Sequence, residues 1–424
     1  MRKTTFRLIP LMALGYGTAY MDRVNISFAA LQMNRDLNFS SAAYGLGAGL
    51  FFLTYAVFEL PSNLLLYRFG ARRWLSRIMF TWGVISMGML FVRTPGQFYV
   101  MRSLLGAAEA GFFPGVVYYL MQWFPPDMRA RTITRFYISL PISSAVMGSL
   151  AGAILNLQGH FGLAGWQWLF LLESIPAIIL SFVFFLALPD GPTQAQWLSP
   201  EEREWMTQAS QRHFASRVYH GQSIAPALYD PRTWLLGLFM LCFTATGYAY
   251  MLHGPTILQE STHLDATRVG YLIAIFNLFG ALVMLLNAIH SDRTQERYWH
   301  ILPVCLVMAF GFAVCGYSSA PRLVVPGFAL LILANSAMQG PLWSLPSTFL
   351  GGRSAAAGIA AINTISILGG FVGPYIMGMA RDLTGQYQRG LTLMAIPMLV
   401  ATSIMLCLRY WDHSARTLEE NSVV

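Results

Sequence analysis

The stretch that decides the fold is FRLIPLMALGYGTAYMDRVNISFAAL, residues 6–31, a long apolar run that carries an acid and a base, Asp22 and Arg23, side by side. About 20 apolar residues in a helix span the ~30 Å hydrocarbon core of a membrane, and this run is long enough. A charge at the bilayer centre costs at least about 2.5–3.5 kcal/mol, so both residues need a partner or a task. The stretch therefore predicts a membrane helix that contributes to a site.

The rest of the chain repeats the same apolar character. Of its 424 residues 55% are hydrophobic and only 11% are charged, against about 25% charged residues in a soluble domain. The apolar runs predict an all-α membrane protein with twelve transmembrane helices rather than a barrel of short alternating strands. The expected helices cover 6–30, 43–67, 74–92, 99–123, 132–156 and 167–188, and then 232–255, 267–290, 301–318, 323–345, 355–380 and 389–410.

A polar gap divides these helices into two groups of six. We expect an N-terminal half over 1–188, a cytoplasmic linker over 189–231 and a C-terminal half over 232–424. Within the linker, Ser199, Pro200 and Glu202 have the spacing of a helix start, with an N-cap, a first-turn proline and a capping-box acid. The linker is therefore predicted to contain one short surface helix.

Two loop segments indicate that the halves are repeats. YRFGARRW (67–74) follows the second expected helix and DRTQERYW (292–299) follows the eighth, with Arg and Trp at matching places 225 residues apart. Two six-helix halves related in this way are typical of the major facilitator fold, in which the substrate site lies near the membrane midplane.

The basic residues set the expected orientation. In the first half ten Lys and Arg residues fall on one side of the membrane and only Arg35 and Arg93 on the other. Because basic loops stay inside, we expect the N-terminus in the cytoplasm, and an even number of helices returns the C-terminus to it. No cleavable leader is evident, and the short loops favour a bacterial inner membrane.

Several classes of function lack support. The net charge of +8 is explained by the cytoplasmic loops, so we expect no nucleic-acid partner. The four cysteines are scattered in apolar runs, without the spacing of a metal site or a disulfide framework. No phosphate loop or nucleophile constellation points to an enzyme, and we expect no cofactor.

The buried charges predict a site for an anion and a proton. Arg23 offers a planar fork of donors that suits a carboxylate. Asp22 and Glu109 are acids that can carry protons, and Glu109 falls at a depth similar to that of Arg23. Arg102, two turns before Glu109, suits a gating or pairing role. The alternative is that these four residues form a static neutral network.

Two other buried polar residues are expected to have structural roles. We interpret Glu173 and His253 as a helix-end residue or a hydrogen-bonded packing residue. Asp22 and Arg23 are adjacent, so they point about 100° apart on a helix and each needs a partner elsewhere.

The sequence resembles the anion:cation symporter family of the major facilitator superfamily over residues 15–385. The resemblance rests on these motifs: YMDRVN (20–25), ELPSNLLLYRFGARRW (59–74), RSLLGAAEAGFFPGVVYYLMQWFP (102–125), GWQWLFLLESIP (165–176), HSDRTQERYWH (290–300), WSLPSTFL (343–350) and GIAAINTISILGGFVGP (358–374).

The resemblance implies roles for individual residues. Arg23 would hold the substrate carboxylate, Asp22 and Glu109 would bind protons, and Arg102 would pair with these acids. Tyr55 and Asn363 would supply polar substrate contacts. We also expect Tyr20, in the same motif as Arg23, to contact the substrate. The loop residues Arg68, Arg72, Asp292 and Arg293 would act in gating. In the first loop Tyr67 stands where the superfamily usually has an acid, which puts that latch in doubt.

The substrate is left open by these patterns. The resemblance implies proton-coupled import of a small organic carboxylate by a monomer embedded in lipid. The overall pattern is closest to members that take tartrate-like hydroxy acids or other sugar acids. Many aromatic residues would also suit an aromatic acid such as 4-hydroxyphenylacetate or phthalate. An anion antiporter or an exporter is the remaining alternative.

Overall fold

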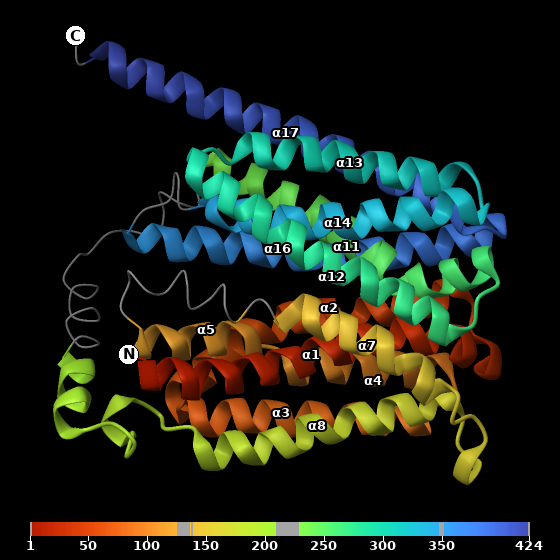
Figure 1. Cartoon of the computed structure of the whole chain (residues 1–424), viewed down its shortest axis with the longest axis horizontal. Coiled ribbons are helices and arrows are strands. Elements are labelled where there is room, and N and C mark those ends of the chain that lie inside the picture. Colours follow the sequence, from red (N-terminus) through yellow and green to blue (C-terminus); the bar gives the residue numbers. More distant parts are fainter. Residues whose placement is uncertain (1, 125–135, 137–138, 209–228, 347–351, 423–424) are drawn as a thin grey trace. The chain divides into compact units, whose positions relative to one another are not determined.

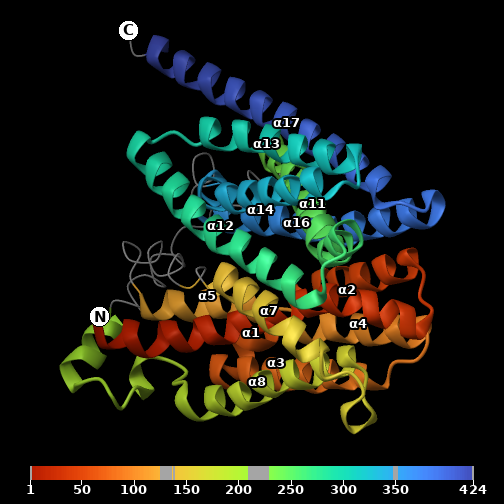
Figure 2. The same cartoon turned by 45° about the vertical axis from the view of Figure 1, so that its right-hand side comes forward.

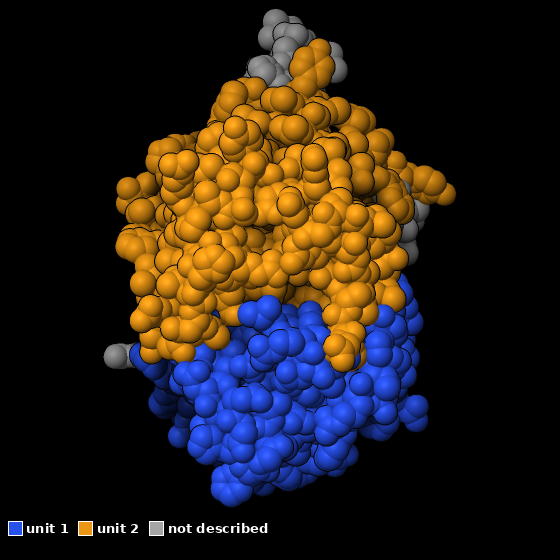
Figure 3. Space-filling view, turned by 90° about the vertical axis from the view of Figure 1, so that its right-hand side faces the viewer, with its two compact units in different colours: residues 1–37, 50–221 blue, residues 38–49, 222–424 orange. Residues whose placement is uncertain are grey.

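The computed structural model describes residues 2–124, 136, 139–208, 229–346 and 352–422 (Figure 1). These residues contain helices and no strand. The chain divides into two compact units, which are coloured separately in Figure 3. The first unit is residues 1–37 and 50–221, and the second is residues 38–49 and 222–424.

The helices of the N-terminal half follow the apolar runs closely. They are α1 (Arg2–Leu37), α2 (Ser41–Phe69), α3 (Ala71–Gly88) with the short η1 (Met89–Phe91), α4 (Pro95–Glu109), α5 (Phe112–Trp123), α7 (Ser139–Leu155), η2 (His160–Gly162), α8 (Gly165–Ala187) and η3 (Pro192–Gln194). In Figures 1 and 2 α3 and α8 lie side by side, and α1 packs against α7 and α8. These contacts bring α1, α3 and α8 together around the Asp22 side chain.

The described residues of the C-terminal half form six long helices. They are α11 (Pro231–Thr262), α12 (Ala266–Thr294), α13 (Tyr298–Tyr317), α14 (Pro321–Ser344), α16 (Gly352–Thr384) and α17 (Tyr387–Ser422). α11 and α16 pack most extensively, because Gly369 and Gly373 of α16 let the two backbones approach. A Cβ atom at Gly373 would overlap the carbonyl oxygen of Ala245 in α11.

The predicted fold class, an all-α membrane protein, is confirmed. Ten of the described helical segments, with α4 and α5 counted as one, are long and apolar enough to cross a membrane. α1 is not among the ten, and it carries Asp22 and Arg23 in its middle. α7 is not among them because its described part has only 17 residues. The expected helix over 132–156 begins outside the described residues.

The first turns of α2 belong to the second unit. The carboxylate of Asp382 in α16 accepts hydrogen bonds from the backbone N–H groups of Ser41, at 2.9 Å, and Ala42, at 2.8 Å. The Tyr44 hydroxyl donates to the carbonyl oxygen of Leu252 at 2.9 Å. A carboxylate at a helix N-terminus satisfies free N–H groups and complements the helix dipole. The start of α2 is therefore held by the Asp382 side chain of α16 and by the Leu252 backbone carbonyl of α11.

The expected linker helix begins as its capping box predicts. The backbone N–H of Glu202 donates to the Ser199 hydroxyl at 3.2 Å, and the Glu202 carboxylate accepts from the Ser199 N–H at 2.9 Å. That N–H and the Lys3 ammonium, 3.0 Å from the carboxylate, lower the pKa of Glu202. The described part of this helix covers residues 200–208, and residues 209–228 of the linker lie outside the described residues.

Candidate functional site

The centre of the candidate site is an ion pair between α1 and α4. Arg23 Nε lies 2.7 Å from Glu109 Oε1, and Arg23 Nη2 lies 2.5 Å from the same oxygen. The Glu109 side chain is fully buried and the Arg23 side chain is 13% exposed. The predicted similar depth of these residues is therefore correct. Removing one partner would leave a buried charge without its counter-ion, which is strongly destabilising.

Aromatic rings from α2 flank the guanidinium of Arg23. The Arg23 guanidinium carbon lies 5.0 Å from the ring centre of Tyr55 and 5.6 Å from that of Phe51. Phe51 and Tyr55 are four residues apart and so share one face of α2. Cation–π attraction to these rings helps to hold the guanidinium in this apolar setting. Tyr55 therefore lies beside Arg23. The contact of Phe51 with Arg23 was not predicted, although the four-residue spacing of Phe51 and Tyr55 is a signal that could have indicated it.

The fourth membrane segment, which the apolar run predicts as one continuous helix over 99–123, breaks at Glu109. α4 ends at Glu109, Ala110 adopts an extended ψ of 134°, and Gly111 has a φ of 84° before α5 begins at Phe112. A Cβ atom at Gly111 would also collide with the Ser62 side chain of α2. Broken helices of this kind occur at the binding sites of transporters. The break places the Glu109 carboxylate at a helix end rather than inside a regular helix.

Asp22 has its own partners, distinct from those of Arg23. The Ser86 hydroxyl of α3 and the Asn25 amide of α1, the latter at 3.4 Å, both donate to Asp22 Oδ1. The Asp22 side chain is only 2% exposed. The expectation that Asp22 and Arg23 find partners elsewhere is confirmed. Asn25 had a signal, since it lies three residues after Asp22 on the same helix, whereas nothing in the sequence marked Ser86.

Arg102 lies near both acids. Its side chain is 1% exposed, and its guanidinium carbon is 4.8 Å from the ring centre of Phe51. It interacts electrostatically with Asp22 and Glu109. Phe51 thus contacts both arginines, and Arg102 supplies the positive charge that balances Asp22.

The other predicted substrate contacts are on separate elements. Tyr20 is half-buried on α1, one turn before Arg23. Asn363 is on α16 in the second unit and is half-buried. Their roles in binding stay predictions.

The structural interpretation holds for His253 and fails for Glu173. His253 Nε2 lies 3.1 Å from the Pro374 carbonyl oxygen, and its ring contacts Tyr44 edge-on, so it is a hydrogen-bonded packing residue. Glu173 is the ninth of the 23 residues of α8 and is 7% exposed. Neither of its carboxyl oxygens makes a hydrogen bond within the described residues. It is therefore not a helix-end residue, and its carboxyl meets the Asn25 amide without a hydrogen bond of normal distance and angle.

In the first of the two loops with a predicted gating role, an acid that no sequence pattern indicated contacts the loop. The backbone N–H of Arg72 donates to Asp190 Oδ1 at 2.9 Å, and Arg72 Nε donates to the carbonyl oxygen of Phe185 at 2.5 Å. Gly70, with a φ of 84°, packs against the same Asp190 carboxylate. Arg68 stacks on Phe69. Asp190, which follows α8, therefore supplies a carboxylate to this loop, in which Tyr67 stands at the position where the superfamily usually has an acid.

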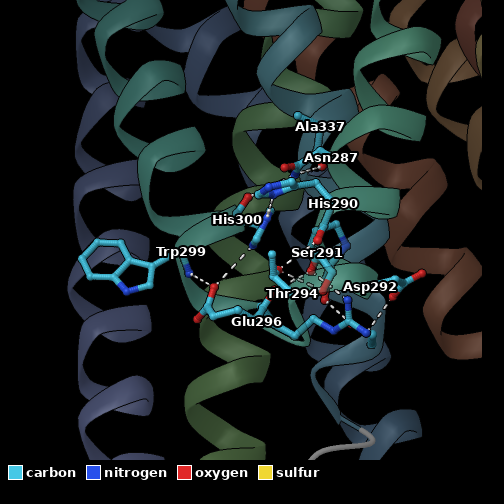
Figure 4. Close-up of polar contacts among 12 residues, drawn as sticks. Asn287, His290, Ser291, Asp292, Thr294, Glu296, Trp299, His300 and Ala337 are labelled. Atoms are coloured by element: carbon cyan, nitrogen blue, oxygen red, sulfur yellow. Dashed lines mark hydrogen bonds and ion pairs between the residues drawn. The ribbon is translucent and has the colours of Figure 1, made fainter.

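The second gating loop is the polar cluster in Figure 4. Arg297 Nη2 pairs with Asp292 at 2.7 Å, and Arg297 Nη1 donates to the Ser291 hydroxyl at 2.7 Å. Arg293 is exposed. Asp292 therefore pairs with Arg297 rather than with its neighbour Arg293, and the gating roles stay predictions.

The same cluster ties α12 to α13 and α14. The Asn287 amide donates to the carbonyl oxygens of His300, at 3.2 Å, and Ala337, at 2.8 Å (Figure 4). The His290 and His300 rings share a hydrogen bond of 2.6 Å. One asparagine therefore connects three helices near this loop.

Comparisons with known proteins agree with this arrangement. The sequence profile of the Major Facilitator Superfamily matches residues 12–374. A protein of Agrobacterium vitis that bears the name "Putative tartrate transporter" is 43% identical over 96% of this chain and 91% of its own length. A quinolone resistance transporter of Acinetobacter baumannii is 40% identical over 94% of this chain and 93% of its own.

Solved structures share the fold. A bacterial homologue of the human lysosomal transporter Spinster, in an inward-facing and occupied conformation, superposes with a TM-score of 0.77 at 16% identity, over 94% of this chain and 95% of its own. These relatives and the fold are those of transporters, not enzymes. This chain is a multi-pass membrane transporter and belongs to the Major Facilitator Superfamily.

Proposed function

We propose that the protein imports a small organic carboxylate, of the tartrate-like hydroxy acid class, together with protons. The observation that carries the proposal is the ion pair between Arg23 and Glu109. Two nitrogens of the Arg23 guanidinium contact the same oxygen of the Glu109 carboxylate, and the pair is buried beside aromatic rings. A substrate carboxylate has the same shape and charge as the Glu109 side chain. Substrate and Glu109 can therefore compete for the same fork of donors.

This competition links the anion to a proton. If a substrate carboxylate takes Arg23 while Glu109 stays ionised, a buried negative charge is left without its partner, which costs about 3–5 kcal/mol. A proton on Glu109 removes that cost, so the anion and the proton each favour binding of the other. Release of the proton on the other side of the membrane restores the ion pair and displaces the anion.

The substrate class is supported by the relatives named as tartrate transporters. A dicarboxylate needs a second cation, and Arg102 is the buried candidate. We infer that Tyr55, Tyr20 and Asn363 offer hydroxyl and amide groups to the hydroxyls of such a substrate, and that Asp22 is a further proton site.

The distribution of basic residues supports the proposed setting. Because basic loops stay on the cytoplasmic side, we infer that the N- and C-termini lie in the cytoplasm. The proposed setting is a bacterial inner membrane, in which the protein is a monomer. Import then moves the anion toward the side on which the Arg68 and Arg72 loop lies.

Export is the second candidate function. A relative named as a quinolone resistance transporter, at 40% identity, favours it. The rings of Phe51 and Tyr55 would also accept a flat aromatic compound, so an aromatic acid is the alternative substrate for import.

Uptake by the purified protein in liposomes distinguishes these functions. We would supply labelled tartrate, 4-hydroxyphenylacetate or a fluoroquinolone, each with an inward proton gradient, with a reversed one and with none. Tartrate accumulation driven only by the inward gradient supports the proposal. Accumulation of the aromatic acid instead changes the substrate, and quinolone movement against the proton flow would establish export. The Arg23→Ala variant should be inactive in each case.

A further inference from the structure

Glu173 is a deeply buried acid that the proposed transport step does not use. It lies eight residues from the start of α8, or about 12 Å along the helix. Its carboxyl is 7% exposed, and both oxygens lack a hydrogen-bond donor among the described residues. An ionised carboxylate in such a place is costly unless it is paired.

The polar groups around Glu173 contain more acceptors than donors. The Ser86 hydroxyl and the Asn25 amide both donate to Asp22 Oδ1. Asp22 Oδ2, Asn25 Oδ1 and the two Glu173 oxygens are left without a donor among the described residues. A proton on one of the two carboxyl groups adds the missing donor, and Asn25 Oδ1 is an acceptor for it.

The charges around Glu173 point the same way. Two groups act on the Glu173 carboxyl. One is the Asn25 amide, which approaches it without a hydrogen bond of normal distance and angle, and the other is the like-charged Asp22 of α1. α3 contributes Ser86 at this level, and α7 has no titratable residue in its described length. Arg102 acts on Asp22, and Arg23 is bound to Glu109. No guanidinium is among the groups found to act on Glu173.

We propose that Glu173 is a proton-binding residue of the transport cycle, which forms a carboxyl pair with Asp22 across Asn25. Two like charges this close in an apolar setting do not ionise together, so the pair holds one proton whenever Asp22 is ionised and balanced by Arg102. When Asp22 takes up a proton, its O–H becomes a hydrogen-bond donor that can stabilise an ionised Glu173. Glu173 then releases its own proton to water when the transport cycle opens the site, so the pair still holds one proton. This inference rests on the proposed proton coupling.

Infrared spectroscopy of the purified protein tests the protonation directly. A protonated buried carboxyl gives a C=O stretching band that an amide or a carboxylate does not give. Glu173→Gln should remove one such band at neutral pH. The matched control Glu202→Gln changes an exposed acid outside the membrane, and it should leave that band in place. If the band persists in Glu173→Gln, Glu173 is not the protonated group and the inference is overturned.

Transport by the same variants tests the role in the cycle. With an imposed proton gradient, Glu173→Gln should lower the number of protons moved per anion and shift the pH profile of uptake, while exchange of labelled for unlabelled anion continues. An unchanged pH profile and proton ratio would make Glu173 a structural acid. Glu173→Asp keeps a carboxyl group and should retain the band. This variant is the alternative test if Glu173→Gln does not fold.

The two hypotheses fail in different ways. If the wild-type protein exchanges anions but never responds to a proton gradient, the proposed coupling is wrong, and Glu173 is then a static buried acid. If the wild type is gradient-driven and Glu173→Gln behaves identically, only the inference fails.

Discussion

At the scale of single residues, the Arg23 guanidinium is the group on which substrate binding should depend. Lysine would keep the charge but not the planar fork or the stacking on Phe51 and Tyr55. We expect Arg23→Lys to weaken anion binding at least about tenfold, or about 1.4 kcal/mol. The measurement is the anion-dependent rise in melting temperature of the detergent-solubilised protein. Wild-type affinity in Arg23→Lys would mean that Arg23 only neutralises Glu109.

Glu109 should separate binding from coupling. Glu109→Gln keeps the shape of the side chain but can neither bind a proton nor hold Arg23 as an anion does. We expect this variant to bind the anion with an affinity that depends less on pH than that of the wild type, and to exchange labelled anion while failing to accumulate it. Counterflow and gradient-driven uptake in the same liposomes give both readings. Accumulation at the wild-type level would place the coupling proton elsewhere.

At the scale of elements, the crossing of α4 and α2 positions the rings beside Arg23. A Cβ atom at Gly106 would overlap the Phe51 carbonyl oxygen and lie too close to the Thr54 hydroxyl. Backbone cannot yield as a side chain can, so Gly106→Ala should displace α2 and with it Phe51 and Tyr55. We expect transport to fall by roughly an order of magnitude, with a destabilisation of about 1–3 kcal/mol.

A glycine in the same helix provides the control. Gly96 has nothing within 4 Å of an added Cβ atom. Gly96→Ala should therefore leave uptake and melting temperature unchanged. Equal effects of both substitutions would show that the Gly106 contact does not control the site.

The bridge made by Asn287 should set the stability of the loop between α12 and α13. Asn287→Ala removes donors to two carbonyl oxygens on two other helices, each hydrogen bond contributing about 0.5–1.5 kcal/mol. We expect a lower melting temperature. Asn277 donates only within its own helix, to Ile273 at 2.9 Å, so Asn277→Ala should have the smaller effect. The reverse order would rule out the bridge as the stabilising contact.

At the scale of the whole molecule, α2 is shared by the two units, with its first turns held by Asp382. Both sides of this contact belong to the second unit, whereas the rest of α2 belongs to the first, so we expect the contact to hold the start of α2 on the second unit during transport. Asp382→Ala leaves two N–H groups of α2 without their acceptor, so residues 38–49 should be released more often. With Cys407 replaced by serine, a cysteine introduced at Ser40 should react faster with a water-soluble maleimide in Asp382→Ala than with Asp382 intact.

Asp265 provides a comparison for that experiment. It caps its own helix, accepting from the N–H of Arg268 at 2.8 Å. Asp265→Ala should leave the reactivity at position 40 unchanged. Equal reactivity with and without Asp382 would show that this carboxylate does not hold α2.

The sequence alone predicted the placement of the ten candidate spans that the described residues contain, because each needs a run of apolar residues whose length the bilayer sets. It also singled out Asp22, Arg23, Arg102 and Glu109, because a charge in such a run stands out against apolar neighbours. The separate partners of Asp22 and Arg23 followed from helix geometry, since adjacent residues face different neighbours.

Only the tertiary structure decided which groups meet. The choice of Glu109 for Arg23, of Ser86 for Asp22 and of Asp190 for the first loop depends on how helices far apart in sequence pack, and nothing local encodes it. The break of the fourth membrane segment at Gly111 was hidden because an apolar run looks the same whether its helix is continuous or broken. Glu173 was misread for the same reason, since hydropathy shows that an acid is buried but not whether a donor lies beside it.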